Sequence, residues 1–147
     1  MECDSTYLMI NVPVYYVKEY KTKDNKTFLV NLNFARTAHY YLQNEVKQWY
    51  SNFIMTKLLK TDFKIKNEYE VALVYYYKNT LSDLDNVCSQ ILKYSLDAFE
   101  KAGVIINDNI KYGKKVTYYV GTCDKENPRV EVYIKHYEDK EKYGCRL

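Results

Sequence analysis

Two aspartates one residue apart, Asp83 and Asp85, are the residues of this sequence whose type and spacing best suit chemistry. They lie in the segment 82–86, where a tyrosine-rich run ends. Asp is favoured at helix N-caps and in first turns, so helix capping is one interpretation of the pair. Residues i and i+2 at the end of a strand point the same way, so the two carboxylates can also converge on a metal ion. This spacing alone leaves both interpretations open.

A third acid, Asp108, lies just beyond the helix expected after the pair. A strand, a helix and a short return are expected to bring it back beside Asp83 and Asp85. Three carboxylates with no His or Cys nearby suit Mg²⁺, with Mn²⁺ as a substitute. Such a site stabilises charge during phosphodiester hydrolysis and generates a hydroxide nucleophile. An EF-hand is excluded, because Val87 and Cys88 occupy positions where that loop needs Asp or Asn and then Gly.

The elements that must position these acids follow from hydrophobic periodicity. Period-two patterns predict strands at 6–20 (interrupted at Pro13), 68–78, 115–122 and 130–137. The polar loop 123–128 between the last two is typical of a hairpin. The segment 28–35 is expected to be a second extended segment or a structured loop.

Two amphipathic helices are predicted, at 39–59 and 85–102, with Gly103 as the left-handed residue that ends the second. His39 is expected to cap or flank the first helix, and Trp49 to lie in its buried stripe with Leu42, Val46 and Phe53. The order of elements predicts a single-domain α+β (mixed α/β) fold over residues 1–138. In it, a mixed four- to five-stranded sheet packs against two main helices.

Composition narrows the classes of protein. The 147 residues carry a net charge of +3, which permits a nucleic-acid partner without requiring one. No apolar run is long enough to span a membrane, and the N-terminus lacks signal-peptide features, so a cytoplasmic protein is expected. The four scattered cysteines predict free thiols rather than a zinc knuckle or disulfides. The charged tail, 139–147, is expected to be mobile.

A run of residues resembles the RusA family of Holliday-junction resolvases. "DLDN" at 83–86 is followed by Lys93, by "LDAF" at 96–99, by "AG" at 102–103 and by Asp108. The resemblance implies a RusA-like fold and a homodimer that resolves four-way DNA junctions with Mg²⁺ by paired symmetric cuts, in recombination and repair. It implies that Asp83, Asp85 and Asp108 are the catalytic metal ligands, and that Lys93 lies near the scissile phosphate. No nucleotide cofactor is implied.

Two departures from the family pattern bear on the site. Asn107 stands where the family usually has a second closing acid, and it can ligate through its amide carbonyl with one charge less. Lys93 follows the first motif by four residues more than usual, which moves it about 6 Å, or one turn, along the helix. Asn86 and Asn107 are candidates for supporting the metal ligands.

Basic residues could follow a DNA backbone, although charged clusters are usually solvated faces. The candidates for DNA binding are Arg36, Lys78, Lys111, Lys114 and Lys115. Two other functions stay open: a broader branched-DNA or flap nuclease on the same site, and a non-catalytic DNA-binding protein that keeps the fold.

Overall fold

The tyrosine-rich strand β5 (Tyr69–Tyr77) lies inside a five-stranded sheet of order β1-β2-β7-β5-β6. The computed structural model describes residues 2–3 and 6–138. The other strands of this sheet are β1 (Glu2–Cys3), β2 (Tyr7–Pro13), β6 (Gly113–Cys123) and β7 (Arg129–His136). β5 pairs parallel with β6 and antiparallel with β7, so the sheet is mixed, as predicted.

The last two strands do not form the predicted hairpin. β6 and β7 follow one another in the chain, but β7 lies between β2 and β5 and pairs antiparallel with both. Val130, Val132 and Ile134 of β7 are fully buried, which suits a strand in the middle of the sheet. A polar loop shows that the chain turns back, but it does not show which strand the chain then pairs with.

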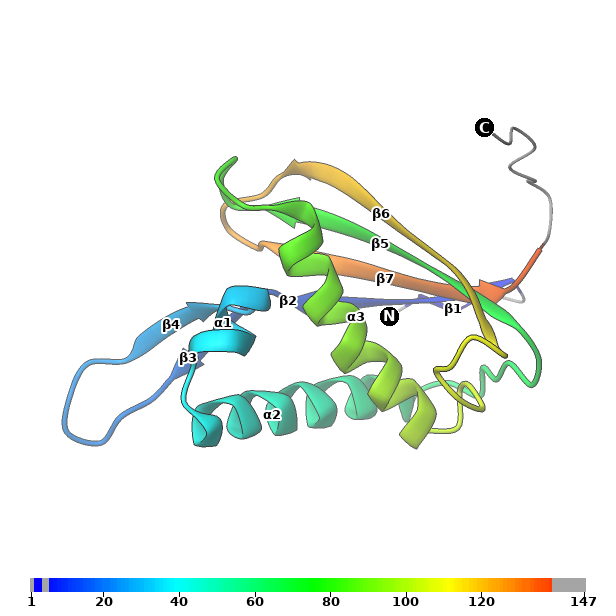
Figure 1. Ribbon diagram of the computed structural model, residues 1–147, viewed down its shortest axis with the longest axis horizontal. Helices are drawn as coiled ribbons and strands as arrows, with labels where there is room; N and C mark the ends of the chain where they lie inside the picture. Colours follow the sequence, from blue (N-terminus) through cyan, green and yellow to red (C-terminus); the bar gives the residue numbers. More distant parts are fainter. Residues whose placement is uncertain (1, 4–5, 139–147) are drawn as a thin grey trace.

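Two helices, α2 (Tyr40–Leu58) and α3 (Leu84–Lys101), pack on one face of the sheet (Figure 1). The sheet contributes alternate buried residues to this core, among them Ile10 and Leu73. Tyr50 of α2 stacks on Tyr94 of α3, with ring centroids 4.9 Å apart. The α+β prediction is confirmed, and so is the pair of main helices. His39 is the N-cap of α2, as predicted, and its Nδ1 accepts a bond from the backbone N of Tyr41.

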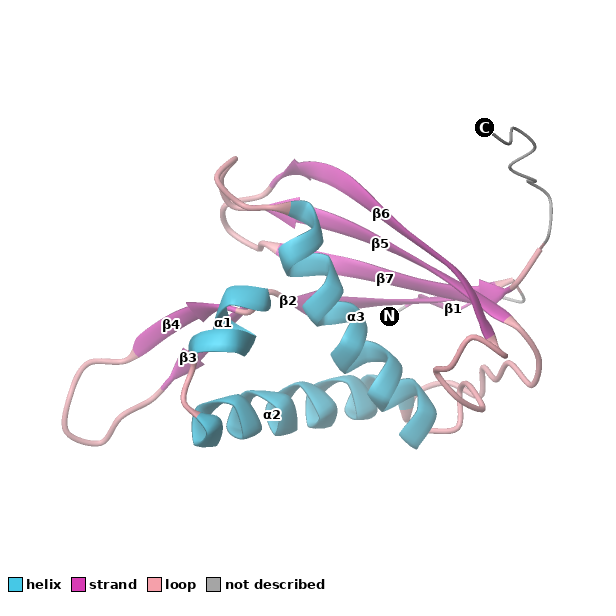
Figure 2. Cartoon of the chain, in the orientation of Figure 1, coloured by secondary structure: helices cyan, strands magenta, loops and turns pink. Residues whose placement is uncertain are grey.

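A small ribbon and a short helix join the sheet to α2. β3 (Tyr15–Lys18) and β4 (Lys26–Leu29) pair antiparallel, and Figure 2 shows this ribbon projecting away from the main sheet. The helix α1 (Leu32–Thr37) follows, capped by Asn31. The expectation of an extended segment at 28–35 is therefore right only for β4, because six residues are too few to show a helical period.

Trp49 does not lie in the core. The buried residues of α2 are Val46, Tyr50, Ile54 and Leu58, while Trp49 is 39% exposed. The observed stripe keeps Val46 but has Tyr50 and Ile54 where Trp49 and Phe53 were expected, because the hydroxyl of Tyr50 has a partner inside the protein. That hydroxyl donates a 2.7 Å hydrogen bond to the carbonyl of Pro13, which satisfies it inside the protein.

The structure covers the predictions on membrane spans, cysteines and the C-terminal tail only for the residues that it describes. No helix among the described residues is long and apolar enough to cross a membrane. Cys88 and Cys123 are free thiols. The tail at 139–147, Cys145 and the side chain of Cys3 lie outside the described part of the chain.

Candidate metal centre

Asp83 is the N-cap of α3. Its Oδ1 accepts hydrogen bonds from the backbone N of Asp85 at 3.0 Å and of Asn86 at 3.4 Å. The capping interpretation is therefore confirmed. Both bonds end on Oδ1, so Oδ2 stays available to a cation while the cap fixes the position of the carboxylate.

Asp85 lies in the first turn of α3 and is exposed. Burial, and after it the charge of Asp85, raises the pKa of the Cys88 thiol to about 12. The same two causes, in the same order, raise the pKa of the Tyr118 hydroxyl on β6. The charge of Asp85 is therefore felt on the side of α3 that faces β6. Asp83 and Asp85 together are called the acid pair below.

Asp108 lies in the loop after α3, and this loop is fixed to the start of β5. The backbone N of Ile65 donates to the carbonyl of Val104, and that of Tyr69 donates to the carbonyl of Tyr112, both at 2.8 Å. Burial, and after it the charge of Asp108, raises the pKa of Tyr69 to about 12. Since Tyr69 begins β5, Asp108 lies at the end of the sheet where β5 starts.

The acid pair lies at the start of α3, whereas Asp108 lies in the loop that follows its other end and leads to β6. Figure 1 shows these two ends of α3 at opposite ends of the sheet. The eighteen residues of α3, at about 1.5 Å each, make the helix between them about 27 Å long. Within the described residues, no three His, Cys, Asp or Glu side chains are grouped so as to hold a metal ion. The predicted convergence of Asp83, Asp85 and Asp108 within one chain is wrong, because the helix that follows β5 runs back along the sheet.

Lys93 and the two asparagines also lie apart. Lys93 is exposed near the middle of α3, eight residues and about 12 Å beyond Asp85. Asn86 is in the first turn, next to the acid pair. Asn107 is near Asp108, and its Oδ1 accepts a 3.0 Å bond from the backbone N of Asn109, so its carbonyl is already used within the loop.

The candidate DNA-binding residues divide between the two ends of α3. Lys78 lies in the connection that leads to the acid pair, with its Nζ 5.5 Å from the ring centroid of Tyr15. Arg36 is exposed on α1. Three lysines follow Asp108 in the chain: Lys111, Lys114 and Lys115.

A hollow of about 200 Å³ adjoins the acid pair, and sequence reasoning missed it. Its lining comes from the end of β5, the loop before α3 and β6: Tyr75, Tyr77, Asn79, Thr80, Ser82, Leu84 and Val120. The Tyr75 hydroxyl donates a 2.9 Å bond to Oγ of Ser82, which ties the loop to β5. The signal available in the sequence was the run of tyrosines at 75–77, a short distance before "SDLDN". In the same loop Leu81 is 93% exposed.

Comparisons with known proteins add no family to this description. No protein-family model matches the chain, and no curated protein matches its sequence significantly.

Proposed function

We propose that this protein is a Mg²⁺-dependent, structure-selective DNA endonuclease that resolves four-way junctions by paired symmetric cuts. One observation carries the proposal: Asp83 caps α3 and Asp85 lies in its first turn, both are exposed, and a hollow partly lined by Tyr75 and Tyr77 lies next to them. Neither carboxylate forms an ion pair with a described residue. The resemblance of residues 83–108 to RusA-type resolvases supports the choice of substrate.

The acid pair fits Mg²⁺ chemically. Mg²⁺ in proteins is commonly held by one or two carboxylates together with waters and substrate phosphates. Oδ2 of Asp83 and the carboxylate of Asp85 would supply those ligands, with Mn²⁺ as a substitute. The N-terminus of a helix carries about half a positive charge. Two carboxylates outweigh it, so the local field still attracts a cation. When bound, the ion would polarise the scissile phosphate and activate a water.

The substrate would lie across the acid pair and the hollow. The phosphate at the cut approaches Asp83 and Asp85, and the neighbouring sugar or base enters the hollow against the rings of Tyr75 and Tyr77. Lys78, in the same connection, would offset the charge of the DNA backbone. In this arrangement Lys93 binds the backbone further along α3, and it does not reach the scissile phosphate.

The homodimer supplies the third acid. Because α3 separates Asp108 from the acid pair, Asp108 can reach the ion only from a second copy of the chain. β6 is an edge strand of the described sheet, and Tyr119 and Val120 on it are 53% and 62% exposed. Because α3 packs against β6, antiparallel pairing of two β6 strands about a two-fold axis would bring the two α3 helices to the same interface, running in opposite directions. The acid pair of each chain then approaches Asp108 of the other.

A second candidate is a non-catalytic DNA-binding protein that keeps the fold. The specific observation in its favour is the separation of Asp108 from the acid pair within one chain. It differs from the first candidate in a single measurable property, which is cutting.

The experiment compares a synthetic four-way junction with a linear duplex of the same sequence, in Mg²⁺ or in EDTA. We expect paired symmetric nicks at the junction in Mg²⁺ only. Asp83→Asn is the matched variant, because Asn is as good an N-cap as Asp but carries no charge. Equal cutting of both substrates would remove junction selectivity, and cutting in EDTA would remove the metal mechanism. Binding without cutting would favour the second candidate.

A further inference from the structure

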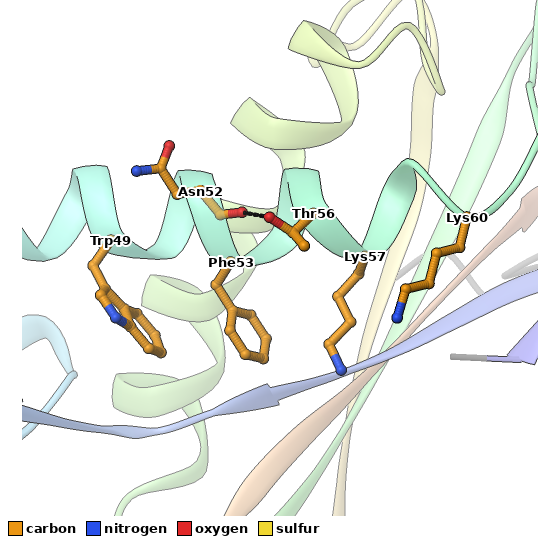
Figure 3. Close-up of a pocket in the computed structure, with 6 residues that line it drawn as sticks. All are labelled: Trp49, Asn52, Phe53, Thr56, Lys57 and Lys60. Carbon is orange, nitrogen blue, oxygen red and sulfur yellow. Dashed lines mark hydrogen bonds between the residues drawn. The ribbon is translucent and has the colours of Figure 1, made fainter.

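The helix α2 carries a second stripe of side chains that the core does not need. Its core stripe is Val46, Tyr50, Ile54 and Leu58. One position before each of the last three lie Trp49, Phe53 and Lys57, and Lys60 follows just beyond the end of the helix. Figure 3 shows Trp49, Phe53, Lys57 and Lys60 extending from the same side of α2. These four residues are called the aromatic–lysine stripe.

The rings of the stripe are held in a fixed arrangement. Trp49 and Phe53 lie nearly parallel, with their planes at 17° and their centroids 5.2 Å apart. The indole also packs edge-on against Tyr16 at 5.9 Å and Tyr50 at 5.0 Å. Because three rings surround it, Trp49 loses little further freedom when a ligand contacts its exposed part.

Two lysines, Lys57 and Lys60, bring positive charge close to these rings. The Nζ of Lys57 lies 5.2 Å from the ring centroid of Phe53. A hollow of about 400 Å³ is lined by the stripe together with Asn52 and Thr56, and no carboxylate lines it. Neither Lys57 nor Lys60 forms an ion pair within the described part of the chain.

On the other side of Trp49 a second hollow is lined by two acids, Glu19 and Glu45, and Glu45 is ion-paired with Lys18. Glu45 accepts hydrogen bonds from the Nζ of Lys18 and from the Tyr16 hydroxyl. This ion pair lowers the pKa of Glu45 and anchors Tyr16 beside the indole. The aromatic–lysine stripe therefore has packed aromatic rings at one end and, at the other, two lysines that form no ion pair with a described residue.

This combination selects a class of ligand. Lysines alone suit any polyanion, and aromatic rings alone suit many apolar partners. Single-stranded nucleic acid alternates planar bases with phosphates, and its bases are free to stack because no complementary strand covers them. Duplex DNA offers the phosphates but keeps its bases inside the helix. The charge and the rings together therefore fit unpaired nucleotides best.

We propose that the aromatic–lysine stripe of α2 binds single-stranded nucleic acid, with a base packed against the exposed parts of the Trp49 and Phe53 rings and the adjoining phosphates on Lys57 and Lys60. This binding involves neither the acid pair nor a metal ion, and it goes beyond the cutting proposed above.

Trp49 is itself the probe, because the chain has a single tryptophan. The test titrates the full chain with a short oligothymidylate in EDTA and follows tryptophan fluorescence. We expect saturable quenching. An abasic oligomer of the same length carries the same charge without bases, and we expect it to quench little. Equal quenching by both oligomers, or quenching by neither, would overturn the proposal.

Variants assign the contacts. Phe53→Leu keeps an apolar side chain but removes the ring, and we expect affinity for oligothymidylate to fall about tenfold. Lys57→Ala combined with Lys60→Ala should reduce the slope of log affinity against log salt by about 1.4. Lys47→Ala is the matched control, because Lys47 is an exposed lysine of α2 outside the hollow. If Lys47→Ala changes binding as much as the double variant does, binding is non-specific and the proposal fails.

Discussion

The two ends of α3 carry parts of one sequence pattern, but they are held in different ways. At its start, the side chain of Asp83 caps the helix and the neighbouring acid is exposed. At its end, the backbone closes the helix: Gly103 has φ 75°, and the N of Val104 donates to the carbonyl of Phe99 at 2.8 Å. Val104 and Ile105 are then buried, which anchors the loop that carries Asp108.

Because the two ends are held differently, variants at the start of α3 test function and variants at its end test stability. Charge changes at the start of α3 leave the core intact, so their effects on cutting can be measured in a folded protein. Backbone changes at the end of α3 alter the fold first.

Loss of a single carboxylate at either end should abolish cutting. We expect Asp85→Asn and Asp108→Asn each to lower the rate of junction cleavage by at least about 100-fold, since outer partners of metal ligands already cost 10- to 100-fold. Gel assays on the four-way junction in Mg²⁺ measure this rate, and circular dichroism checks folding. Full activity of Asp108→Asn would confine the site to the acid pair.

Gly103→Ala should be the most destabilising of the helix-end variants. A Cβ at Gly103 has room, since its nearest neighbour is Nζ of Lys64 at 3.7 Å, so the cost arises from the positive φ. That cost is about 1–2 kcal/mol of unfolding free energy, measured by urea denaturation. Gly103→Asn is the control, because Asn adopts this conformation more readily. Equal losses in the two variants would point to a steric cause instead.

Asp83→Ala should cost about 1 kcal/mol of unfolding free energy, because it removes the N-cap of α3, whereas Asp83→Asn should cost only a fraction of that. Urea denaturation of the two variants measures the difference. Both variants should lose cutting, so stability and activity separate only in Asp83→Asn. If Asp83→Asn cuts normally, capping is the whole role of Asp83.

The smallest effects are on two tyrosines, one toward each end of α3. Asp108→Asn should lower the pKa of Tyr69 and leave that of Tyr118 unchanged, while Asp85→Asn should do the reverse. Tyrosine-labelled NMR titrations without Mg²⁺ measure both values. In the monomeric chain, a change at Tyr118 in Asp108→Asn would place Asp108 beside the acid pair of its own chain and contradict the fold, whereas in the dimer the same change would come from Asp108 of the second copy.

Tyr69 also links stability to alkaline pH. Burial and the charge of Asp108 raise its pKa from 10.0 to about 12, so the unfolded chain releases this proton first. The stability that Tyr69 contributes is therefore complete below pH 10 and is lost as the pH rises towards 12. Unfolding by urea across this range should show a shallower loss of stability in Asp108→Asn.

Most of the fold could be predicted from periodicity, because buried strands and helices repeat their apolar residues regularly. β5, α2 and α3 lie within a few residues of their predicted positions. The position of β7 between β2 and β5 could not be predicted, since pairing between distant strands leaves no signal in the loop that joins β6 to β7. The helix α1 was missed because it is short.

The local chemistry of the site could be predicted, but its assembly could not. Capping by Asp83 was predicted, but the expected alignment of the two carboxylates at a strand end is wrong, because β5 ends at Tyr77 and Asp85 already lies in the first turn of α3. Asp108 is close to them in the pattern of the sequence, but α3 carries the chain about 27 Å away before that residue is reached. The number of residues between Asp85 and Asp108 does not reveal this separation, because it does not show in which direction the helix runs.

If each site takes its acid pair from one chain and Asp108 from another, two inactive variants can restore cutting when they form a mixed dimer. Asp83→Asn and Asp108→Asn chains are refolded together and assayed on a four-way junction in Mg²⁺. With random pairing about half of the dimers are mixed, and each mixed dimer contains one intact site of two, so we expect nicking at about one quarter of the wild-type sites. These nicks should be single cuts rather than paired ones. No recovery above the separate variants would contradict a site shared between two chains.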